Sequence, residues 1–319
     1  MSKISVAMTT YNGAAFLELQ LQSLLEQTRL PDEVIICDDG SQDNTVDILK
    51  DFIKKNKLER WTVFENSENH GYVENFRKAM SLTTGDVVFL CDQDDIWNPR
   101  KIEIIANILE RDTAILALAS GYSCIDSLGN PIGASVKKFY TAPFWSKGLW
   151  EVSKVRYGRI LYFNMAQGCS TAYRRSLVDR YCATASCNRL SHDWALNMMA
   201  YDSGGLYFLN KELIHYRIHE HNTIGVVAAA GAITHRIPRL ENYADEIVDA
   251  LQLPLRETTK NDIRDIVNLT HARIAFLREK RMCVWCRGFA QHLLPLSRFF
   301  LLQYIKDLVL VLLKRTPVQ

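Results

Sequence analysis

The sequence predicts an α/β protein in which helices flank a mostly parallel β-sheet, with a helical extension at the C-terminus. Over the first 120 residues, short apolar runs alternate with segments of helical period, and several runs end in polar turns. After about residue 225 this alternation gives way to longer helical patterns. We therefore expect one domain over residues 1–225, divided into halves at residue 120, and a separate helical region over residues 226–319.

Each expected strand is a short run of mainly apolar residues, bounded by turn-forming residues. In chain order the expected strands are Ile4–Met8, Glu33–Cys37, Trp61–Glu65, Asp86–Cys91 and Ile115–Ala119. Strands that alternate with helices in this way form parallel sheets that are covered on both faces.

The helices between these strands are expected at Ala15–Gln27, at about Asn44–Lys54, from Gly71 to Met80, and from Pro99 onward. Glycine breaks the chain before the third of them, and proline is favoured in the first turn of the fourth. Beyond residue 225, two amphipathic helices are expected over Ala228–Leu253 and Thr258–Lys280, with Pro254 between them.

Composition excludes several classes of protein. The 319 residues are 48% apolar and 23% charged, which is typical of a folded globular chain. A formal net charge of +2 gives no field that would attract a polyanion, so a nucleic-acid partner is not expected. The eight scattered cysteines indicate buried thiols in a reducing compartment, and Cys283 and Cys286 have no second pair that would complete a metal site. Ile4–Met8 is too short for the core of a signal peptide, which predicts a cytosolic protein.

Three polar clusters follow expected strands, at Thr9–Asn12, Asp38–Ser41 and Asp92–Asp95. Ligands of parallel α/β sheets bind outside the carboxyl ends of the strands, so all three clusters are expected at one edge. The first two could also be plain turns with a helix cap.

The third cluster is more informative about function than the first two. Asp92, Asp94 and Asp95 follow the apolar strand Val87–Leu90, and three such close carboxylates repel one another unless a cation neutralises them. Aspartate oxygens are hard ligands that suit Mg²⁺ or Mn²⁺, which commonly take phosphate oxygens as further ligands. We therefore expect a metal–diphosphate site. The sequence contains neither GxGxxG after the first strand nor GxxxxGK[ST], which disfavours a dinucleotide cofactor and excludes a P-loop.

Several motifs in this order resemble the family 2 glycosyltransferases of the GT-A fold, which is Rossmann-like. The residues that carry the resemblance are Ile4–Asn12, Gln27-Thr28, Pro31–Ser41, Gly85-Asp86 and Asp92–Asp95. The match is close over the first 100 residues and looser to about residue 225. It implies that residues 1–120 bind a nucleotide sugar and that residues 121–225 supply the acceptor side.

The resemblance also implies roles for single residues. Thr9 and Tyr11 would line the base and ribose pocket, and Asp39 would hydrogen-bond a pyrimidine. Asp94 would contact the metal, with Asp92 nearer the ribose and a second candidate ligand; Asp95 is an extra carboxylate that leaves the metal assignment open. The full set expected to bind the nucleotide sugar is Thr9, Tyr11, Asn12, Asp39, Asp92, Gln93, Gly168, Arg217 and His219.

In the second half, the segment around Gly168 resembles the part of the family that closes over the donor sugar. Asp193 lies where the family places its catalytic base; alternatively, or in addition, it caps a helix over Trp194–Tyr201. Arg217 and His219 could neutralise phosphate charge. A metal cluster of His215, His219 and His221 is less favoured because acidic ligands are sparse nearby.

The segment Asp92–Trp97 resembles bacterial rhamnosyltransferases that build cell-surface polysaccharides. It implies an inverting transferase that moves L-rhamnose from dTDP-L-rhamnose to a lipid-linked saccharide of O-antigen, capsule or wall polymer. A UDP-hexose donor is the alternative. A nucleotidyltransferase is disfavoured because Thr9–Gly13 contains no Arg or Lys, and a non-catalytic sugar-nucleotide-binding protein because the acidic cluster and Asp193 are retained.

The C-terminal segment Arg287–Arg315 is apolar but too interrupted by charge to span a membrane. An interfacial helix fits it better, with one apolar face formed by Phe299, Leu302, Ile305, Val309 and Leu312. Residues 278–315 contain eight Lys/Arg against Glu279 and Asp307, which suits an anionic bilayer, so we expect a peripheral protein on the inner face of a bacterial plasma membrane. The alternative is a helix packed on the catalytic domain or in an oligomer interface.

Overall fold

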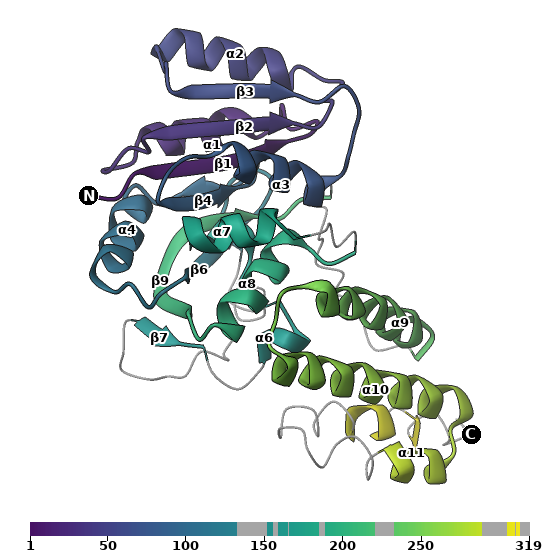
Figure 1. The fold of residues 1–319 in the computed structure, drawn as a ribbon. Coiled ribbons are helices and arrows are strands. Elements are labelled where there is room, and N and C mark those ends of the chain that lie inside the picture. Colours follow the sequence, from purple (N-terminus) through teal and green to yellow (C-terminus); the bar gives the residue numbers. More distant parts are fainter. Residues whose placement is uncertain are drawn as a thin grey trace. The chain divides into compact units, whose positions relative to one another are not determined.

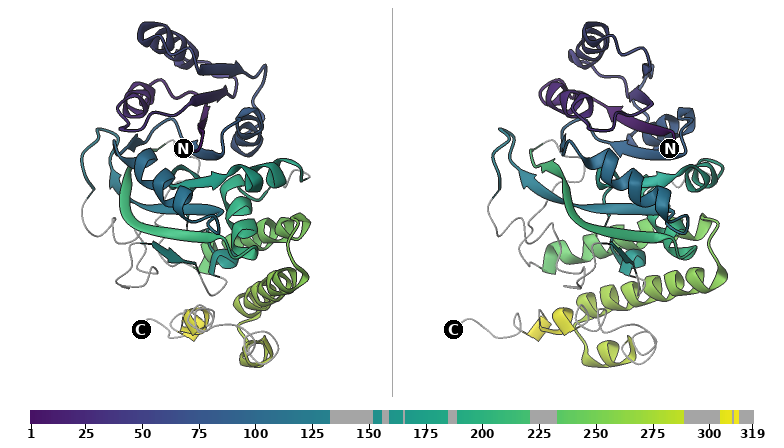
Figure 2. Two further views of the ribbon diagram at one scale, coloured as in Figure 1. Left: turned by 60° about the vertical axis from the view of Figure 1, so that its left-hand side comes forward. Right: turned by 90° about the vertical axis from the view of Figure 1, so that its left-hand side faces the viewer.

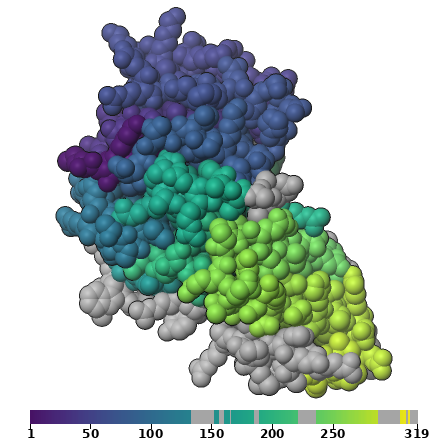
Figure 3. Space-filling view, in the orientation of Figure 1, coloured from purple at the N-terminus to yellow at the C-terminus, as the bar shows by residue number. Residues whose placement is uncertain are grey.

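The computed structural model describes residues 1–132, 152–155, 159–164, 166–184, 189–220, 233–288, 305–309 and 311–312. Contacts divide the chain into two compact units. The first, here called the sheet unit, comprises Met1–Arg156, Phe163–Ser186 and Ser191–Val226. The second, the helical unit, comprises Tyr157–Tyr162, Cys187–Leu190 and Val227–Gln319. In Figures 1 and 3 the colours run from purple to green through the sheet unit and on to yellow in the helical unit.

The sheet unit is built on a nine-stranded sheet with the order β3-β2-β1-β4-β8-β6-β9-β5, and β7 pairs with β9 off this path. The strands are β1 Ile4–Thr10, β2 Glu33–Asp38, β3 Trp61–Glu65, β4 Val87–Cys91, β5 Ile96–Trp97, β6 Ala117–Ile125, β7 Val152–Lys154, β8 Thr171–Arg174 and β9 Leu206–Arg217. The strands β3, β2, β1 and β4 are mutually parallel, whereas β8 is antiparallel to both β4 and β6.

Helices cover the sheet on both faces, and Figure 2 shows α1 and α3 on opposite sides of β1. The helices of this unit are α1 Leu17–Leu25, α2 Thr45–Asn56, α3 Tyr72–Leu82, α4 Lys101–Arg111, α7 Arg175–Cys182 and α8 His192–Asp202, with a 3₁₀ turn η1 at Gly168–Ser170. The expected α/β fold, with helices flanking the sheet, is confirmed.

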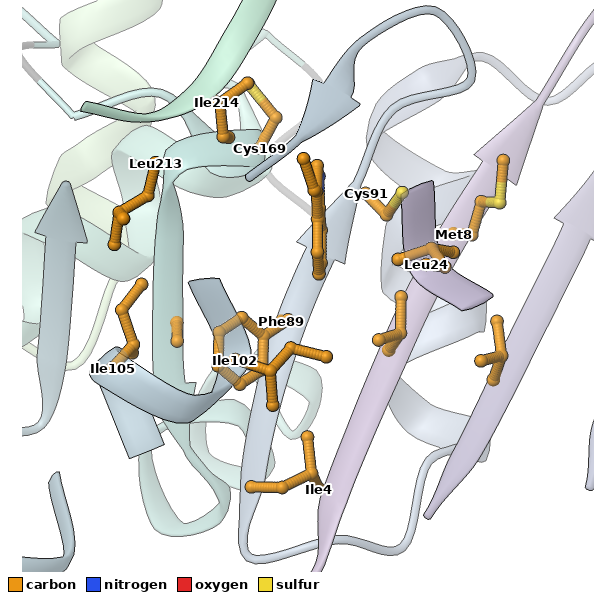
Figure 4. Packing of buried hydrophobic residues seen from close by; sticks show 14 of the residues in the cluster. Ile4, Met8, Leu24, Phe89, Cys91, Ile102, Ile105, Cys169, Leu213 and Ile214 are labelled. Carbon is orange, nitrogen blue, oxygen red and sulfur yellow. The ribbon is translucent and has the colours of Figure 1, made fainter. Parts of the chain in front are cut away.

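The core explains why the central strands have no polar face. Every residue of β1 and β4 is buried, because helices cover both sides of these strands. Figure 4 shows Ile4, Phe89 and Ile102 packed together within this core. Burying one such side chain contributes roughly 1.5–3 kcal/mol. These contacts fix the strand ends, and therefore the loops that leave them.

Several elements differ from the expected ones: β6 begins at Ala117 and runs on to Ile125, and β5, β7 and β8 were not expected. The helix α1 is shorter at both ends, and α4 begins at Lys101, two residues after Pro99. The 12-residue strand β9 was not expected at all, since Lys211 and Glu212 interrupt its apolar pattern. Those two residues lie on an exposed stretch, next to register shifts in the pairing of β6 with β9.

The helical unit contains α6 Arg159–Tyr162, α9 Ile233–Asp249, the 3₁₀ turn η2 Ala250–Gln252, α10 Glu257–Glu279 and α11 Met282–Gly288, and residues 305–309 and 311–312 are also helical. Its core is formed by Leu240, Ile274, Phe276, Leu277 and Val311. Pro254 lies between η2 and α10, at the expected break.

A buried ion-pair cluster joins four segments of the helical unit. Asp307 is fully buried, and one of its carboxylate oxygens accepts a hydrogen bond from Arg273 Nε at 2.6 Å. The other oxygen accepts from Arg236 Nε, and Arg273 also donates to the hydroxyl of Tyr162. Both oxygens of this carboxylate are thus paired with guanidinium groups. We call these four residues the Asp307 cluster.

Next to this cluster, Ile305, Val309 and Leu312 are exposed by 38%, 45% and 49%. Their spacing of four and three residues places them on one helical face, while Asp307 and Val311 point into the unit. Among the described residues, no helix has the length and apolar character that a membrane crossing needs. Phe299 and Leu302, expected on the same face, lie outside the described residues.

Candidate active site

The three polar clusters after β1, β2 and β4 meet at one edge of the sheet, because these strands are neighbours and run parallel. Gln93 joins two of them: its side-chain oxygen accepts from the N–H of Tyr11 at 2.8 Å, and its amide nitrogen donates to the carbonyl of Tyr11 at 3.0 Å. A Cβ on Gly13 would lie 2.1 Å from Gln93 Oε1, so a side chain at this position would displace Gln93.

The first and second clusters are also linked directly. The N–H of Asn12 donates to Ser41 Oγ at 2.9 Å, and the N–H of Gln42 donates to Asn12 Oδ1 at 2.8 Å. Asn12 has a φ of 47°, in the left-handed region that asparagine tolerates better than most residues. Tyr11 remains 45% exposed, whereas Thr9 is buried. Of the two, only Tyr11 presents a large open surface at this edge.

Asp39 is buried and already hydrogen-bonded. Its carboxylate accepts from the side chain of Asn66 at 2.8 Å, from the N–H of His70 at 3.0 Å and from the N–H of Gly71 at 2.9 Å. Three of roughly four acceptor positions of the carboxylate are therefore used by the loop before α3. Gly71 begins this helix with a φ of 85°, which favours glycine. Sequence reasoning missed this loop, because its partners are 27 to 32 residues from Asp39.

The acidic cluster contains a group of three side chains, of which Asp95 and Cys169 are buried and Asp92 is half-buried. Carboxylate oxygens of Asp92 and Asp95 and the sulfur of Cys169 all lie within 4.8 Å of one another. Burial, together with the charges of Asp94 and Asp193, raises the pKa of Asp92 to about 7. Burial and the neighbouring carboxylates also raise the pKa of Asp95 well above its usual range.

The two carboxylate oxygens of Asp95 differ in their hydrogen bonding. One oxygen accepts from the backbone N–H of Arg217 at 3.1 Å, while Oδ2 has no hydrogen-bond partner among the described residues. A buried oxygen without a hydrogen bond costs free energy, and a proton or a cation bound to it would recover that cost. Asp95 Oδ2 is therefore a place where a proton or a cation fits.

Asp94 is turned away from that group. Its Oδ2 lies 2.8 Å from His219 Nε2, and the two side chains are 14% and 9% exposed. The ring of Phe16 lies beside His219, with centroids 4.6 Å apart. Asp94 and His219 therefore form a second, more accessible pair of ligand atoms at the same edge.

Arg217 lies behind both pairs. Its Nε donates to the carbonyl of Asp94 at 2.7 Å, and Nη1 donates to the carbonyls of Asp126 and Ser127 at 3.1 and 3.2 Å. The side chain is 1% exposed, and its guanidinium lies 5.0 Å from the ring centroid of Phe16. In this structure it holds the backbone of the acidic loop in place.

Asp193 lies in the first turn of α8, and the N-cap position is occupied by Ser191. The expectation that Asp193 caps a helix beginning at Trp194 is therefore wrong in position, because the helix starts at His192. One oxygen of Asp193 accepts from the N–H of Trp194 at 2.7 Å, and the other from the N–H of Gly168 at 2.9 Å. Gly168 also connects Asp193 to the acidic cluster, because the sulfur of the next residue, Cys169, lies within 4.8 Å of a carboxylate oxygen of Asp92.

His192 precedes this carboxylate and is buried. Its ring stacks on Phe76 with centroids 4.1 Å apart, and burial lowers the pKa of His192 to about 4. The neutral imidazole thus packs α8 against α3. Of the other histidines considered, His215 lies 2.7 Å from the hydroxyl of Ser123, and His221 lies outside the described residues, as does Asn222–Gly225.

Sequence reasoning also missed Lys101. This lysine is fully buried, donates to the carbonyl of Cys169 at 2.6 Å, and has its pKa lowered to about 7 by burial. The signal was present in the sequence. Lys101 falls on the same helical stripe as Ile105 and Leu109, where a charged residue is not expected without a partner.

These residues offer a metal sulfur, oxygen and nitrogen as ligand atoms. Cys169 is a poor ligand for Mg²⁺ or Mn²⁺, and burial raises the pKa of its thiol well above the usual range. Asp94 supplies a hard oxygen, His219 an imidazole nitrogen that suits Mn²⁺ better than Mg²⁺, and Asp92 a further carboxylate. The residues present therefore fit a divalent ion at the Asp94 side of the cluster.

Comparisons with known proteins identify the family of this chain. The family model described as glycosyl transferase family 2 matches residues 5–182. An uncharacterized glycosyltransferase of Nostoc is 27% identical over 229 residues, which cover 72% of this chain and 68% of the relative. The dTDP-rhamnosyl transferase RfbG of Shigella flexneri is 26% identical over 255 residues, which cover 75% and 82%. Several other relatives are matched over less than half of their own length.

Solved structures show the same fold. The S. aureus protein TarS, residues 1–349 in complex with UDP-GlcNAc, superposes with a TM-score of 0.58 at 20% identity, covering 96% of this chain and 79% of that one. The mannosyltransferase PcManGT of Pyrobaculum calidifontis, in complex with GDP-Man and Mn²⁺, gives 0.56 at 16% identity, covering 98% and 86%. Because the family model spans more than half of the chain, the protein belongs to glycosyl transferase family 2.

Proposed function

We propose that this family 2 glycosyltransferase is an inverting, metal-dependent enzyme that moves a sugar from a nucleotide donor to a saccharide acceptor. The observation that carries the proposal is the position of Asp193. The N–H of Gly168 holds this carboxylate at 2.9 Å, and the sulfur of the next residue, Cys169, lies within 4.8 Å of carboxylate oxygens of Asp92 and Asp95. We therefore place the base and the donor-binding cluster at one site.

Asp193 suits the role of general base. Each of its oxygens accepts one backbone hydrogen bond, which leaves lone pairs for an incoming hydroxyl. Asp193 also lies in the first turn of α8, near the positive end of the helix dipole. Asp193 would take the proton of the acceptor hydroxyl as that oxygen attacks the anomeric carbon from the face opposite the leaving diphosphate. Attack from that side inverts the configuration at the anomeric carbon.

Mg²⁺ or Mn²⁺ would be held by Asp94, with His219, 2.8 Å from Asp94 Oδ2, and Asp92 as further candidate ligands. The ion would stabilise the charge of the leaving diphosphate. Asp95 and Arg217 support this loop from behind, since the backbone N–H of Arg217 bonds Asp95 and the guanidinium bonds the carbonyl of Asp94. Arg217 therefore acts mainly by placing Asp94.

The nucleotide would lie along the joined ends of β1, β2 and β4. Tyr11 offers an exposed ring for the base or ribose, Gln93 holds the backbone of Tyr11 in place, and Asn12 joins the turn to Ser41. Thr9 shapes the floor beneath it. Asp39 would reach a pyrimidine through its remaining acceptor position or by exchanging one of its loop bonds. Gly168 would line the donor-sugar side next to Asp193.

For the donor we propose dTDP-L-rhamnose, with a UDP-hexose as the alternative. The Asp92–Trp97 segment and the similarity to RfbG, which extends over 82% of that protein, support rhamnose. The acceptor would be a lipid-linked saccharide of a bacterial cell-surface polysaccharide. A relative described as a putative teichuronic acid biosynthesis glycosyltransferase of Bacillus subtilis, 34% identical over 141 residues, supports this class of product.

We assign residues 1–225 to the transferase domain and residues 226–319 to a helical region that touches the inner face of the plasma membrane. Its exposed Ile305, Val309 and Leu312 form an apolar face, and the charge of Asp307 is neutralised internally by two arginines. Arg236 and Arg273, which pair with Asp307, lie outside residues 278–315. The negative charge of Asp307 therefore does not reduce the positive charge that this segment offers to a membrane. An oligomer interface on the same face is the rival explanation.

One assay tests the chemistry. Purified protein is incubated with dTDP-rhamnose or a UDP-hexose, with and without Mn²⁺. Hydrolysis of the donor, in which water takes the place of the saccharide acceptor, is followed by the release of the nucleoside diphosphate. We expect release only with metal, and none from Asp94→Asn at unchanged thermal stability. Full turnover in excess EDTA would refute the metal, and turnover of UDP-hexoses alone would refute rhamnose.

A separate assay tests the membrane. We expect the protein to sediment with anionic vesicles and to be released as salt rises, because screening weakens surface attraction. Val309→Asp should abolish sedimentation while the protein stays monomeric. Vesicle binding that Val309→Asp leaves unchanged, or a dimer that this substitution dissociates, would count against membrane contact.

A further inference from the structure

Lys101 is a buried cation that the proposed chemistry does not use. It is the first residue of α4 and has no exposed surface. Its ammonium lies 3.3 Å from the ring centroid of Trp97 and 6.0 Å from that of Phe89. A buried ammonium persists in a protein core only where nearby groups compensate its charge.

Two features compensate this charge. The ammonium donates to the carbonyl oxygen of Cys169 at 2.6 Å, and it attracts the carboxylates of Asp95 and Asp92. Those carboxylates and the sulfur of Cys169 lie within 4.8 Å of one another. One lysine and two aspartates therefore meet at this site, where Lys101 and Asp95 are buried and Asp92 is half-buried.

The carbonyl that Lys101 holds belongs to the turn η1. The residue before it, Gly168, donates its N–H to Asp193 at 2.9 Å, and the residue after it, Ser170, accepts from the hydroxyl of Ser120 at 3.2 Å. Lys101 and Asp193 thus bind backbone groups of adjacent residues in the same three-residue turn. Movement of this turn would move the partner of the proposed base.

We propose that Lys101 is a positioning residue of the donor site, acting both as counter-charge to Asp92 and Asp95 and as the anchor of the Gly168–Ser170 turn. The counter-charge role is independent of the reaction. The anchor role rests on the proposed function, since it acts through Asp193. The two roles are tested separately, so that failure of the proposed function is distinguishable from failure of this inference.

A double-mutant cycle tests the counter-charge, with the urea midpoint as readout. Lys101→Met should lower the midpoint, because it leaves the carboxylates of Asp92 and Asp95 without a cation. Adding Asp95→Asn should recover a large part of that loss, whereas Asp112→Asn, just beyond the other end of α4, should recover none. If the losses of Lys101→Met and Asp95→Asn are simply additive, the counter-charge role is wrong. Should Lys101→Met not fold, the same cycle is run with Lys101→Gln.

The anchor is tested by comparing two variants in transfer kinetics. Lys101→Gln keeps an N–H donor for the Cys169 carbonyl and removes the charge, while Lys101→Met removes both. We expect kcat to fall by tenfold or more in Lys101→Met and by no more than about threefold in Lys101→Gln. Equal kcat values in the two variants would overturn the anchor. If Asp193→Asn also turns over normally, the proposed function fails, and the stability cycle still decides the counter-charge.

Discussion

The two units of this protein bury charged groups in different ways. In the Asp307 cluster of the helical unit, both carboxylate oxygens accept hydrogen bonds from arginine, and Arg273 also bonds Tyr162. In the sheet unit, Asp95 and its neighbour Asp92 share one lysine, and Asp95 Oδ2 has no partner among the described residues. Both oxygens of the Asp307 carboxylate are therefore paired, whereas only one oxygen of the Asp95 carboxylate is.

The pKa values reflect the same contrast. The Asp307 carboxylate and the Tyr162 hydroxyl more than offset burial and raise the pKa of Arg273, whereas burial lowers the pKa of Lys101 to about 7. A fully paired buried charge is a structural element, and an underpaired one is a place prepared for another ligand. The contrast therefore separates the part of the molecule that holds shape from the part that does chemistry.

The largest expected effect is on the Asp307 cluster. Asp307→Asn leaves Arg273 buried without its counter-charge, and should lower the free energy of unfolding by about 3–5 kcal/mol. Chemical denaturation measures this loss. The control is Glu241→Gln, which removes the exposed pair with Arg278 and should cost about 0–1 kcal/mol. Equal losses in the two variants would show that the Asp307 cluster is not structural.

The next effect concerns catalysis. Asp193→Asn removes the proposed base while keeping the shape of the side chain, and transfer should fall by about 10²-fold or more. Donor binding, followed by calorimetry, should persist. Asp179→Asn, on the exposed side of α7, is the control and should leave transfer unchanged. Transfer by Asp193→Asn within a few-fold of the original rate would show that this carboxylate only orders Gly168.

A third effect depends on pH. The pKa of His192 is lowered to about 4 in the folded state, below the value of about 6.5 in the unfolded chain. Its contribution to stability is therefore fully present above pH ~6.5 and is lost as pH falls towards 4. His192→Phe keeps the stacking on Phe76 and should flatten the loss of stability between pH 6.5 and 4. An unchanged pH profile would contradict a buried neutral imidazole.

The smallest effect is on Asp95 itself. Asp95→Asn keeps an oxygen for the N–H of Arg217 and removes a buried, underpaired charge. The free energy of unfolding should change by less than about 1 kcal/mol, in contrast to Asp307→Asn. Denaturation without added metal measures this difference. A loss as large as that of Asp307→Asn would mean that both buried carboxylates are structural and would remove the contrast between the units.

Much of the sheet unit could be predicted from the sequence, because its information is local. Apolar runs mark β1 to β4, and polar residues at the ends of parallel neighbours must meet at one edge. Asp193, in contrast, required a resemblance, since nothing near it in the chain indicates that Gly168, 25 residues earlier, bonds it. The strand β9 was missed because its exposed charged residues hide the alternation.

Side-chain contacts between residues far apart in the chain could not be predicted from the sequence either. Asp307 bonds arginines that precede it by 34 and 71 residues, so its charge looked like part of a polar helix face. Lys101 could have been noticed on an apolar stripe, but not the Cys169 carbonyl 68 residues away. Which carboxylate of the acidic cluster faces outward also depends on the turn after β4, and the spacing of the aspartates does not reveal it.

The two hydrogen bonds between Gln93 and Tyr11 have a thermodynamic consequence. The side-chain amide of Gln93 both accepts from and donates to the backbone of Tyr11, as a peptide group of a paired strand would. It thereby extends the pairing of β1 with β4 beyond the last backbone pair, Met8–Cys91. Loops at strand ends usually lose conformational entropy when a ligand binds. Here that ordering occurs during folding, and the Tyr11 amide should exchange with deuterium as slowly as an amide inside the sheet.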